Sequence, residues 1–415
     1  MTALGVAPSR VRAADGGPLT VTLGLAGLAL GGCQINAVDL GRTLRAAGHD
    51  VSLFAVADET VTRSVTTSVV PYAEAAGLDI EILPAGQGLW RTARAIDRLA
   101  AAHHSDVVHV FAPWLARPLG VAAASWRARA AVETNWTMAN AFWGSPAVPL
   151  IVGTGAMLAE AAPRRAAVHL MEPPVDAVAD RPDPGAGRAF REAHGIADTE
   201  TLVAVVSRLD REMKAAGIEQ AIAAVAAADT PLRLVVVGDG DAFADLAAAA
   251  RRVDTALRRS AVVLTGSLLD PHPAYAAADI VLGMGGSAIR GLAHGKPVVV
   301  LGEDGFLLTY EPDTVPHFRR EGFYGHGGRT DPVGELAATL DALAADPARR
   351  AELGAFGLRQ VADRFGLAAA ADGLVGVYRQ ALTRLPSRPR RAAEAGRLLA
   401  REGLSRTRRL LRERP

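Results

Sequence analysis

The sequence has few of the residues that stabilise secreted, fibrous or membrane-spanning proteins. Its 415 residues include one cysteine, Cys33, so no disulfide can form within the chain, and a reducing cytoplasm is expected. Glycine and proline are frequent but follow no period, which excludes a collagen-like fibre. The apolar run Leu19–Leu30 is too short and too rich in glycine to cross a bilayer, and it lacks the cleavage context of a signal peptide. We therefore expect a cytoplasmic protein.

The chain also lacks a net charge of either sign, because 45 Lys and Arg residues face 44 Asp and Glu residues. Residues 384–415 are an exception, with 11 Arg and 3 Glu giving a net charge of +8 and leaving −7 on the remainder. The main body therefore has no polyanion-binding character, and no nucleic-acid partner is expected. The basic tail is interpreted either as a solvated end or as an amphipathic helix in peripheral contact with the inner face of a membrane. Its apolar residues are Leu398, Leu399, Leu404, Leu410 and Leu411.

Short apolar segments alternate with helical segments along most of the chain. This alternation predicts parallel sheets covered by helices on both faces. The Pro-, Gly- and Asp-rich stretch "EPPVDAVADRPDPGAG" separates two such series, and the chain length also suggests two domains. The predicted fold class is α/β, with two doubly wound, Rossmann-like domains facing a cleft. The predicted parts are a leader (1–18), a first domain (19–172), a second domain (173–365), a closing helix (366–383) and the basic tail (384–415).

Two cations follow a predicted buried strand in the stretch "VVSRLDREMKAAG" of the second series. Arg208 offers a planar fork to phosphate oxygens, and Lys214 offers a mobile point charge, so the pair suits a diphosphate. Ligands of doubly wound sheets bind beyond the carboxyl ends of the strands, which is where this pair is expected. The alternative is two solvated surface cations.

A glycine-rich turn in the same series is a second candidate for phosphate binding. In "VLGMGGSAIRGLAHGKPVVV", Gly283, Gly285 and Gly286 allow close approach of the backbone, and Ser287 is the expected N-cap of the next helix. The N–H groups at the start of that helix favour an anion. The first series has its own glycine turn, but no G-x-G-x-x-G stands in the frame of a dinucleotide site.

No convincing set of metal ligands is evident in the sequence. Asp239 and Asp241 in "VVVGDGDAF" could form a carboxylate pair, but aspartate and glycine are also the residues that tight turns use. We favour the turn, and we expect neither a metal nor a cofactor.

Several of these stretches occur in an order that resembles a known family. "SRLDREMK", "VVVGDG", "LTG", "YAAAD" and "HGKPVVV" resemble the carboxy-terminal half of the retaining GT-B glycosyltransferases of family four, the group 1 type. "LGRTLRAAGHDV" and "DVVHVFAP" resemble the amino-terminal half, so the resemblance covers about residues 19–380. It implies a nucleotide-diphosphate sugar as donor, bound mainly by the second domain, and an unknown acceptor on the first. Arg208 and Lys214 would neutralise the departing diphosphate, with no metal.

The family's two glutamates, spaced by seven residues, are both missing. They fall on Leu282 and Arg290, and an arginine cannot replace a carboxylate because it only donates hydrogen bonds. Either the donor sits differently or another group substitutes. Glu303 and Asp304 in "LGEDGF" are candidates, although that stretch is also typical of a turn.

The resemblance also assigns roles to other positions. His109, where many relatives have His-x-His, is a candidate catalytic residue beside Arg208 and Lys214; the equal alternative is a satisfied core histidine. Glu133, Asn135 and Trp136, just past a strand end, are candidates for acceptor binding, with packing as the alternative. The candidates for donor binding are Gly31, Gly32, Gly238, Gly266, Gly285, Gly286, Ser287, Ala288, Arg290 and Glu303.

The function predicted first is a retaining, metal-independent glycosyltransferase of hexosyltransferase type that uses a nucleotide-diphosphate sugar. A non-catalytic binding or partner subunit of the same fold is the second possibility, because it would account for the missing glutamates. A nucleotide-sugar epimerase of the same architecture is the third.

Overall fold

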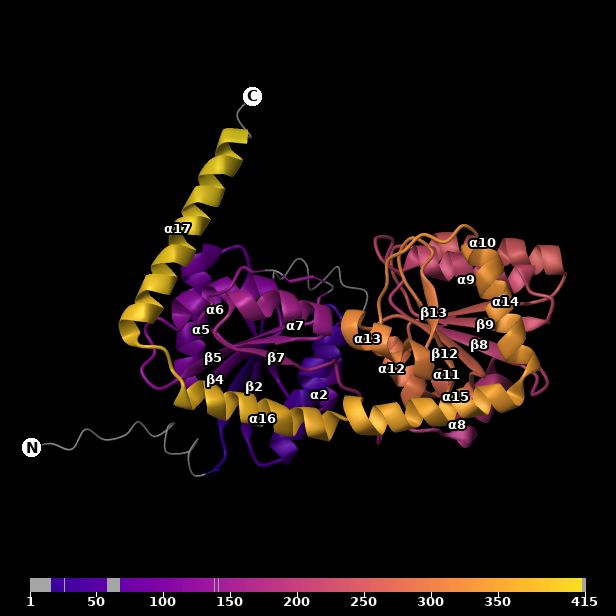
Figure 1. Ribbon diagram of the computed structural model, residues 1–415, viewed down its shortest axis with the longest axis horizontal. Coiled ribbons are helices and arrows are strands. Elements are labelled where there is room, and N and C mark those ends of the chain that lie inside the picture. The colour runs from indigo at the N-terminus through magenta and orange to yellow at the C-terminus, as the bar shows by residue number, and fades with distance from the viewer. Residues whose placement is uncertain (1–15, 26, 58–67, 138, 141, 413–415) are drawn as a thin grey trace, which may run out of the picture. The chain divides into compact units, whose positions relative to one another are not determined.

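The structure is a computed structural model that describes residues 16–25, 27–57, 68–137, 139–140 and 142–412, with side chains described as far as residue 403 (Figure 1). Positions 1–15 of the predicted leader thus lie outside the described residues. The chain divides into two compact units. Unit 1 comprises Met1–Pro173 and Leu367–Pro415, and unit 2 comprises Pro174–Gly366.

Unit 1 is built on a seven-stranded sheet in the order β3-β2-β1-β4-β5-β6-β7, with every pair parallel. The order reverses between β1 and β4, which is the switch point where doubly wound sheets bind ligands. The edge strand β3 is not predicted from the sequence, because its segment "IEILP" is short and partly exposed. The strands are β1 (Thr20–Leu25), β2 (Asp50–Ala57), β3 (Ile80–Pro84), β4 (Val107–Val110), β5 (Ala130–Asn135), β6 (Leu150–Val152) and β7 (Val168–Leu170).

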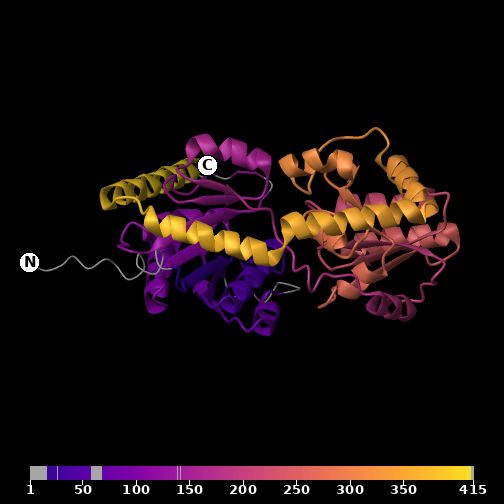
Figure 2. The ribbon, with the colours of Figure 1, turned by 60° about the horizontal axis from the view of Figure 1, so that its bottom comes forward.

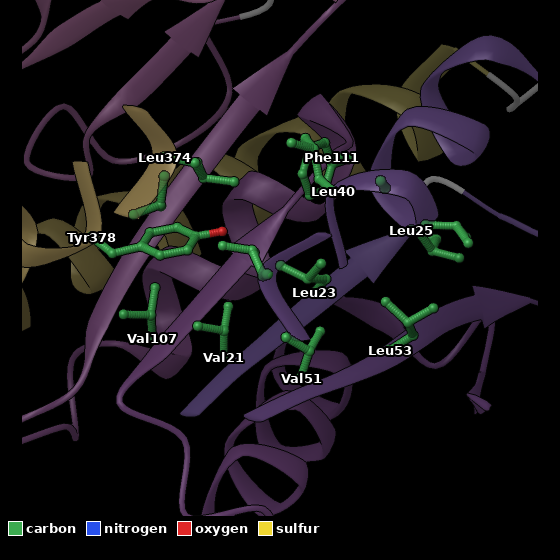
Figure 3. Close-up of a cluster of buried hydrophobic side chains, with 14 of the residues drawn as sticks. Val21, Leu23, Leu25, Leu40, Val51, Leu53, Val107, Phe111, Leu374 and Tyr378 are labelled. Atoms are coloured by element: carbon green, nitrogen blue, oxygen red, sulfur yellow. The ribbon is translucent and has the colours of Figure 1, made fainter. Parts of the chain in front are cut away.

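Helices cover both faces of this sheet, and alternate residues of each strand point to opposite sides. On β2, Leu53 joins the core under α2 and α16, whereas Phe54 joins the core under α5 and α6. Figure 3 shows the first of these cores, with Leu374 and Tyr378 of α16 against the strands. The helices of unit 1 are α2 (Gly32–Ala46), α4 (Val70–Ala75), α5 (Gly88–Ala102), α6 (Ala116–Ala122), α7 (Gly155–Ala161), α16 (Leu367–Thr383) and α17 (Arg388–Arg412).

The C-terminal segment contributes two helices to unit 1. The closing helix α16 packs on α2 and β5 (Figure 2), and the basic tail continues as α17, which packs on α6 and α5. Leu398 of α17 is buried in the core next to α6, so this leucine is not part of an exposed apolar face. The side chains of Leu404, Leu410 and Leu411 lie outside the described residues. None of the described helices has both the length and the apolar composition needed to span a bilayer.

Unit 2 is built on a six-stranded sheet in the order β10-β9-β8-β11-β12-β13. All pairs are parallel except β12 with β13, which are antiparallel. The switch point lies between β8 and β11. The strands are β8 (Thr201–Val206), β9 (Leu232–Val237), β10 (Val262–Gly266), β11 (Ile280–Gly283), β12 (Val298–Leu301) and β13 (Leu307–Thr309).

Three helices of unit 2 begin with the same local signal. Asp183, Asp331 and Asp346 each accept a hydrogen bond from the backbone three residues on, and each is followed by a proline at the first helical position. The helices are α8 (Pro184–Ala193), α9 (Ala215–Ala227), α10 (Phe243–Leu257), α11 (His272–Ala277), α12 (Gly286–Ala293), α13 (Val315–Glu321), α14 (Pro332–Ala345) and α15 (Pro347–Gln360). Two parallel-dominated, doubly wound units confirm the predicted fold class.

Candidate functional site

The two phosphate-binding candidates of unit 2 meet at its switch point. The segment with Arg208 and Lys214 follows β8, and the glycine loop from Gly283 to Ser287 follows β11. Because β8 and β11 are parallel neighbours, their carboxyl ends lie at the same edge of the sheet. The topology therefore places both segments where an anionic ligand of this fold would bind.

Lys214 makes the contact that joins the two segments. Its Nζ lies 2.8 Å from the Sδ of Met284, inside the glycine loop. The pKa of Lys214 is lowered to about 8, mainly by burial; Arg208 contributes to this shift, whereas Asp210 and Glu303 oppose it. Only two of the 45 basic residues are lysines, Lys214 and Lys296. A partly desolvated cation at this position gains strongly from an anionic ligand.

Arg208 is more exposed than Lys214. Its side chain is 59% exposed, and its Nη2 lies 3.7 Å from the Oδ2 of Asp210. An exposed ion pair at this distance contributes little to stability, so the guanidinium can turn toward a ligand at small cost.

The glycine loop turns sharply before α12. Gly285 has a φ of +62° and is the N-cap of the helix. The prediction that Ser287 is the N-cap is wrong, because the turn at Gly285 lets the helix begin at Gly286, one residue before Ser287. The Oγ of Ser287 instead lies 3.1 Å from both the N and the O of Met284, which fixes the loop. A Cβ added at Gly286 would meet nothing within 4 Å, so the backbone is open to a ligand there. Ala288 is buried and can offer only its backbone.

Gly238 holds the ends of neighbouring strands together. It has a φ of +146°, and a Cβ there would lie 1.8 Å from the carbonyl oxygen of Ser207. Its N–H donates to the carbonyl of Gly266, 2.9 Å away, at the end of β10. The aspartates after it stabilise the turn, because Asp239 accepts from the N–H of Gly240 and Asp241 accepts from the N–H of Arg211.

Glu303 follows β12, the neighbour of β11, and is, after Asp210, the second carboxylate that acts electrostatically on Lys214. Its Oε2 lies 3.3 Å from the Nδ1 of His326. Arg290, a predicted donor-binding residue, is directed elsewhere: its Nε lies 3.3 Å from the Oδ2 of buried Asp180.

In unit 1, the glycine turn lies at the corresponding switch point. Gly31 is the N-cap of α2 with an extended backbone, and a Cβ at Gly32 would meet nothing within 4 Å. The Sγ of Cys33 donates to the carbonyl oxygen of Phe111, 3.2 Å away, which ties the start of α2 to the end of β4.

His109 is completely buried, and both ring nitrogens are engaged. Nδ1 lies 2.8 Å from the hydroxyl of Tyr378 and Nε2 lies 2.7 Å from the hydroxyl of Thr134. Burial lowers the pKa of His109 to about 3, so the imidazole is neutral at physiological pH. This position favours the alternative of a satisfied core histidine.

The three acceptor candidates of unit 1 already have partners within the unit. Glu133 forms an ion pair with Arg165, with 3.0 Å between Oε2 and Nη1 and with both side chains at most 2% exposed. Asn135 accepts from the N–H of Thr137, and the Nε1 of Trp136 donates to the carbonyl of Met171. These contacts favour the packing alternative for all three residues.

Sequence reasoning missed Met284, Arg165, Tyr378 and Asp180, each of which contacts a predicted site residue. Met284 had a signal, because it stands between the glycines of the loop. The others are distant in sequence from their partners and belong to segments with no motif of their own.

Comparisons with known proteins agree with this architecture. The family model described as glycosyltransferase family 4 matches residues 30–169, and the model described as glycosyl transferases group 1 matches residues 200–313. Together these segments span more than half of the chain. No curated protein matches the sequence.

Solved structures of glycosyltransferases share the fold. HepE of Anabaena in complex with UDP is 16% identical, with a TM-score of 0.66, covering 86% of this chain and 99% of HepE. A glycosyltransferase from Rickettsia africae is 14% identical, with a TM-score of 0.65, covering 89% of this chain and 100% of the Rickettsia protein. The catalytic domain of starch synthase IV from Arabidopsis thaliana, bound to ADP and acarbose, is 13% identical, with a TM-score of 0.61. The match covers 88% of this chain and 100% of the Arabidopsis domain.

These likenesses identify the architecture as GT-B. The two family models match in the expected order, the first within unit 1 and the second within unit 2. The chain therefore belongs to the group 1, family 4 type of glycosyltransferases.

Proposed function

We propose that this glycosyltransferase moves a sugar from a nucleotide-diphosphate sugar to an acceptor, with retention of configuration and without a metal in the transfer step. The observation that carries the proposal is the contact between Lys214 and Met284, which joins a cation to an open glycine loop at the switch point of unit 2. The nucleoside diphosphates bound by the Anabaena and Arabidopsis relatives support a diphosphate at this position. Retention rests on the family resemblance.

The chemistry follows from the charge on the leaving group. When the bond between the sugar and the phosphate breaks, its electron pair stays on the diphosphate. Lys214, Arg208 and the first N–H groups of α12 offer positive charge at that place. Stabilisation that grows as the charge develops lowers the barrier rather than only strengthening substrate binding.

Glu303 is the proposed substitute for the missing family carboxylate. It follows the strand next to β11, and it acts electrostatically on Lys214, so it belongs to the same edge of the sheet. Arg290 is engaged with Asp180 and in this proposal does not contact the nucleotide.

A thermal-shift screen against UDP-, GDP-, ADP- and TDP-sugars tests the donor site. One nucleotide class is expected to raise the Tm, because a ligand that binds only the folded state stabilises it. The variant Gly286→Leu should keep its own Tm within about 2 °C, since the added side chain meets open space. It should nevertheless lose at least about tenfold in nucleotide affinity, about 1.4 kcal/mol of binding free energy.

Gly376→Leu is the matched control for this screen, because Gly376 is also a helical glycine with nothing within 4 Å of an added Cβ. Gly376 lies in unit 1, so the Gly376→Leu variant should bind the nucleotide like the wild type. If no nucleotide sugar stabilises the protein, or if both variants bind equally well, the donor site is not at this loop. Stabilisation without transfer or hydrolysis would indicate a non-catalytic binding protein.

The ionisation of Lys214 gives a pH-dependent prediction. The protonated amine is the form that binds a diphosphate, so the Kd should be flat below pH 8 and should rise above it, by up to about tenfold per pH unit. Because the chain has two lysines, reductive methylation with carbon-13 gives two lysine NMR signals that can be titrated separately. The Lys214 signal should titrate near 8 and move upward when nucleotide binds. A Lys214 signal that nucleotide leaves unchanged would contradict the proposed contact between Lys214 and the diphosphate.

A further inference from the structure

Three side chains of unit 2 converge at the C-terminal end of α12, the end opposite the glycine loop. They are Asp180, which precedes α8, His272, at the first position of α11, and His294, the C-cap of α12. The Oδ1 of Asp180 lies 3.4 Å from the Nδ1 of His272 and 3.9 Å from the Nε2 of His294. The three ligand atoms all lie within 4.8 Å of one another. His294 is the first residue of the stretch "HGKPVVV", but the resemblance gives its side chain no role, and Asp180 and His272 lie outside the quoted stretches.

The two imidazoles have nitrogen atoms that make no hydrogen bond to any described residue. The side chain of His294 is 1% exposed, and neither of its ring nitrogens has such a bond. The Nδ1 of His272, which faces Asp180, also has none. His294 is held in place by stacking on Tyr275, with ring centroids 5.2 Å apart and planes at 8°. Buried polar atoms are almost always satisfied, so these nitrogens indicate a missing partner.

The spacing and the donor types suit a small divalent transition-metal ion. Zinc bonds of about 2.0–2.2 Å in a tetrahedral site place neighbouring ligand atoms roughly 3.3–3.5 Å apart. The carboxylate lies at that distance from His272, and its 3.9 Å distance from the Nε2 of His294 exceeds this range by only a few tenths of an ångström. Two imidazoles and one carboxylate form a ligand set that zinc accepts, with a fourth position left open.

The surroundings order the carboxylate for such a role. The Nε of Arg290 lies 3.3 Å from the Oδ2 of Asp180, so the other oxygen, Oδ1, is the one directed toward the histidines. Arg290 thus orients Asp180 through Oδ2, as hydrogen-bonded partners commonly orient the carboxylates that bind metals. The positive charge of Arg290 disfavours the binding of a metal cation nearby, but the negative charge of Asp180, with which Arg290 pairs, offsets this repulsion. The side chain of His272 is 34% exposed, which gives an ion a route from solvent.

We propose that Asp180, His272 and His294 bind one zinc ion, separate from the site of sugar transfer. The ion joins the segment before α8 to α11 and α12, and it fixes the carboxylate that holds Arg290. The proposal does not depend on the proposed function, because the ligands lie outside the glycine loop and the Lys214 segment.

Metal binding by the full-length, tag-free chain tests the proposal. The chain is treated with a chelator, dialysed, and titrated with Zn²⁺ by calorimetry and with Co²⁺ by visible absorption. We expect one Zn²⁺ per chain, a higher Tm in its presence, and the d–d absorption of a four-coordinate Co²⁺ site. His272→Gln and His294→Gln should each weaken Zn²⁺ binding at least about tenfold, because each removes one of three ligands.

His103→Gln is the matched control. His103 is also 34% exposed and also pairs with a carboxylate, that of Glu81, in unit 1. It should leave Zn²⁺ affinity unchanged. If His294→Gln fails to fold, the partly exposed His272 still gives a decisive comparison. The proposal is overturned if the wild type takes up no Zn²⁺, or if His272→Gln and His103→Gln bind it with the affinity of the wild type.

Discussion

Lys214→Ala is expected to lower kcat/KM for sugar transfer by about 10²–10³-fold, the usual effect of removing one group that stabilises charge in a transition state. Most of the loss should appear in kcat, because the negative charge on the leaving diphosphate grows as the bond breaks. The free energy of unfolding should stay the same or increase. Burial lowers the pKa of this amine from 10.5 to about 8, which means that the folded protein holds the charge at a cost.

Lys296→Ala is the control for Lys214→Ala, because the chain has no third lysine. The Nζ of Lys296 donates to the carbonyl of Ala276, 2.8 Å away, so this lysine is tied to the backbone of α11. Its removal should reduce stability and leave kcat/KM of the folded protein within about threefold of the wild type. Steady-state kinetics with the donor found in the screen, together with chemical denaturation, separate the two effects. Transfer by Lys214→Ala at the wild-type rate would remove the proposed role in leaving-group stabilisation.

The fold was largely predictable because its signals are local. Buried parallel strands appear in the sequence as apolar runs. The Asp-Pro pairs before α8, α14 and α15 also mark helix starts, but they did not contribute to the predicted fold, and the first pair was assigned to the stretch between the two series. The strands that were missed are those with weak local signals. The edge strand β3 is half exposed, and β13 has three residues and pairs antiparallel.

The site was predictable only where strand order determines proximity. Lys214 and the glycine loop follow neighbouring parallel strands, so their meeting at Met284 could be expected from the order of the elements. Pairings between other segments could not be foreseen. His109 meets Tyr378 from 269 positions away, and Arg290 meets Asp180 from 110 positions away. Those contacts depend on how whole helices pack, which no short motif encodes.

The buried ion pair of unit 1 gives the largest expected effect on stability. Arg165→Met should lower the free energy of unfolding by about 3–5 kcal/mol, because it leaves the carboxylate of Glu133 buried without its charge partner. Burial already raises the pKa of Glu133, and Arg165 opposes that shift. Without the arginine the pKa rises further, so the variant should be less unstable at acid pH and should lose stability as the pH rises through that pKa.

Chemical denaturation between pH 5 and pH 8 measures this effect, and the adjacent residue supplies the control. Arg164 also pairs with a glutamate, Glu160, but its side chain is 54% exposed, so Arg164→Met should cost less than about 1 kcal/mol. The double variant Glu133→Gln/Arg165→Met should recover much of the lost stability, since no buried charge remains. If Glu133 only packs, the folded double variant keeps its KM for the acceptor; if Glu133 binds the acceptor, that KM rises. A cost below about 1 kcal/mol for Arg165→Met would show that Glu133 is solvated or already protonated in the native protein.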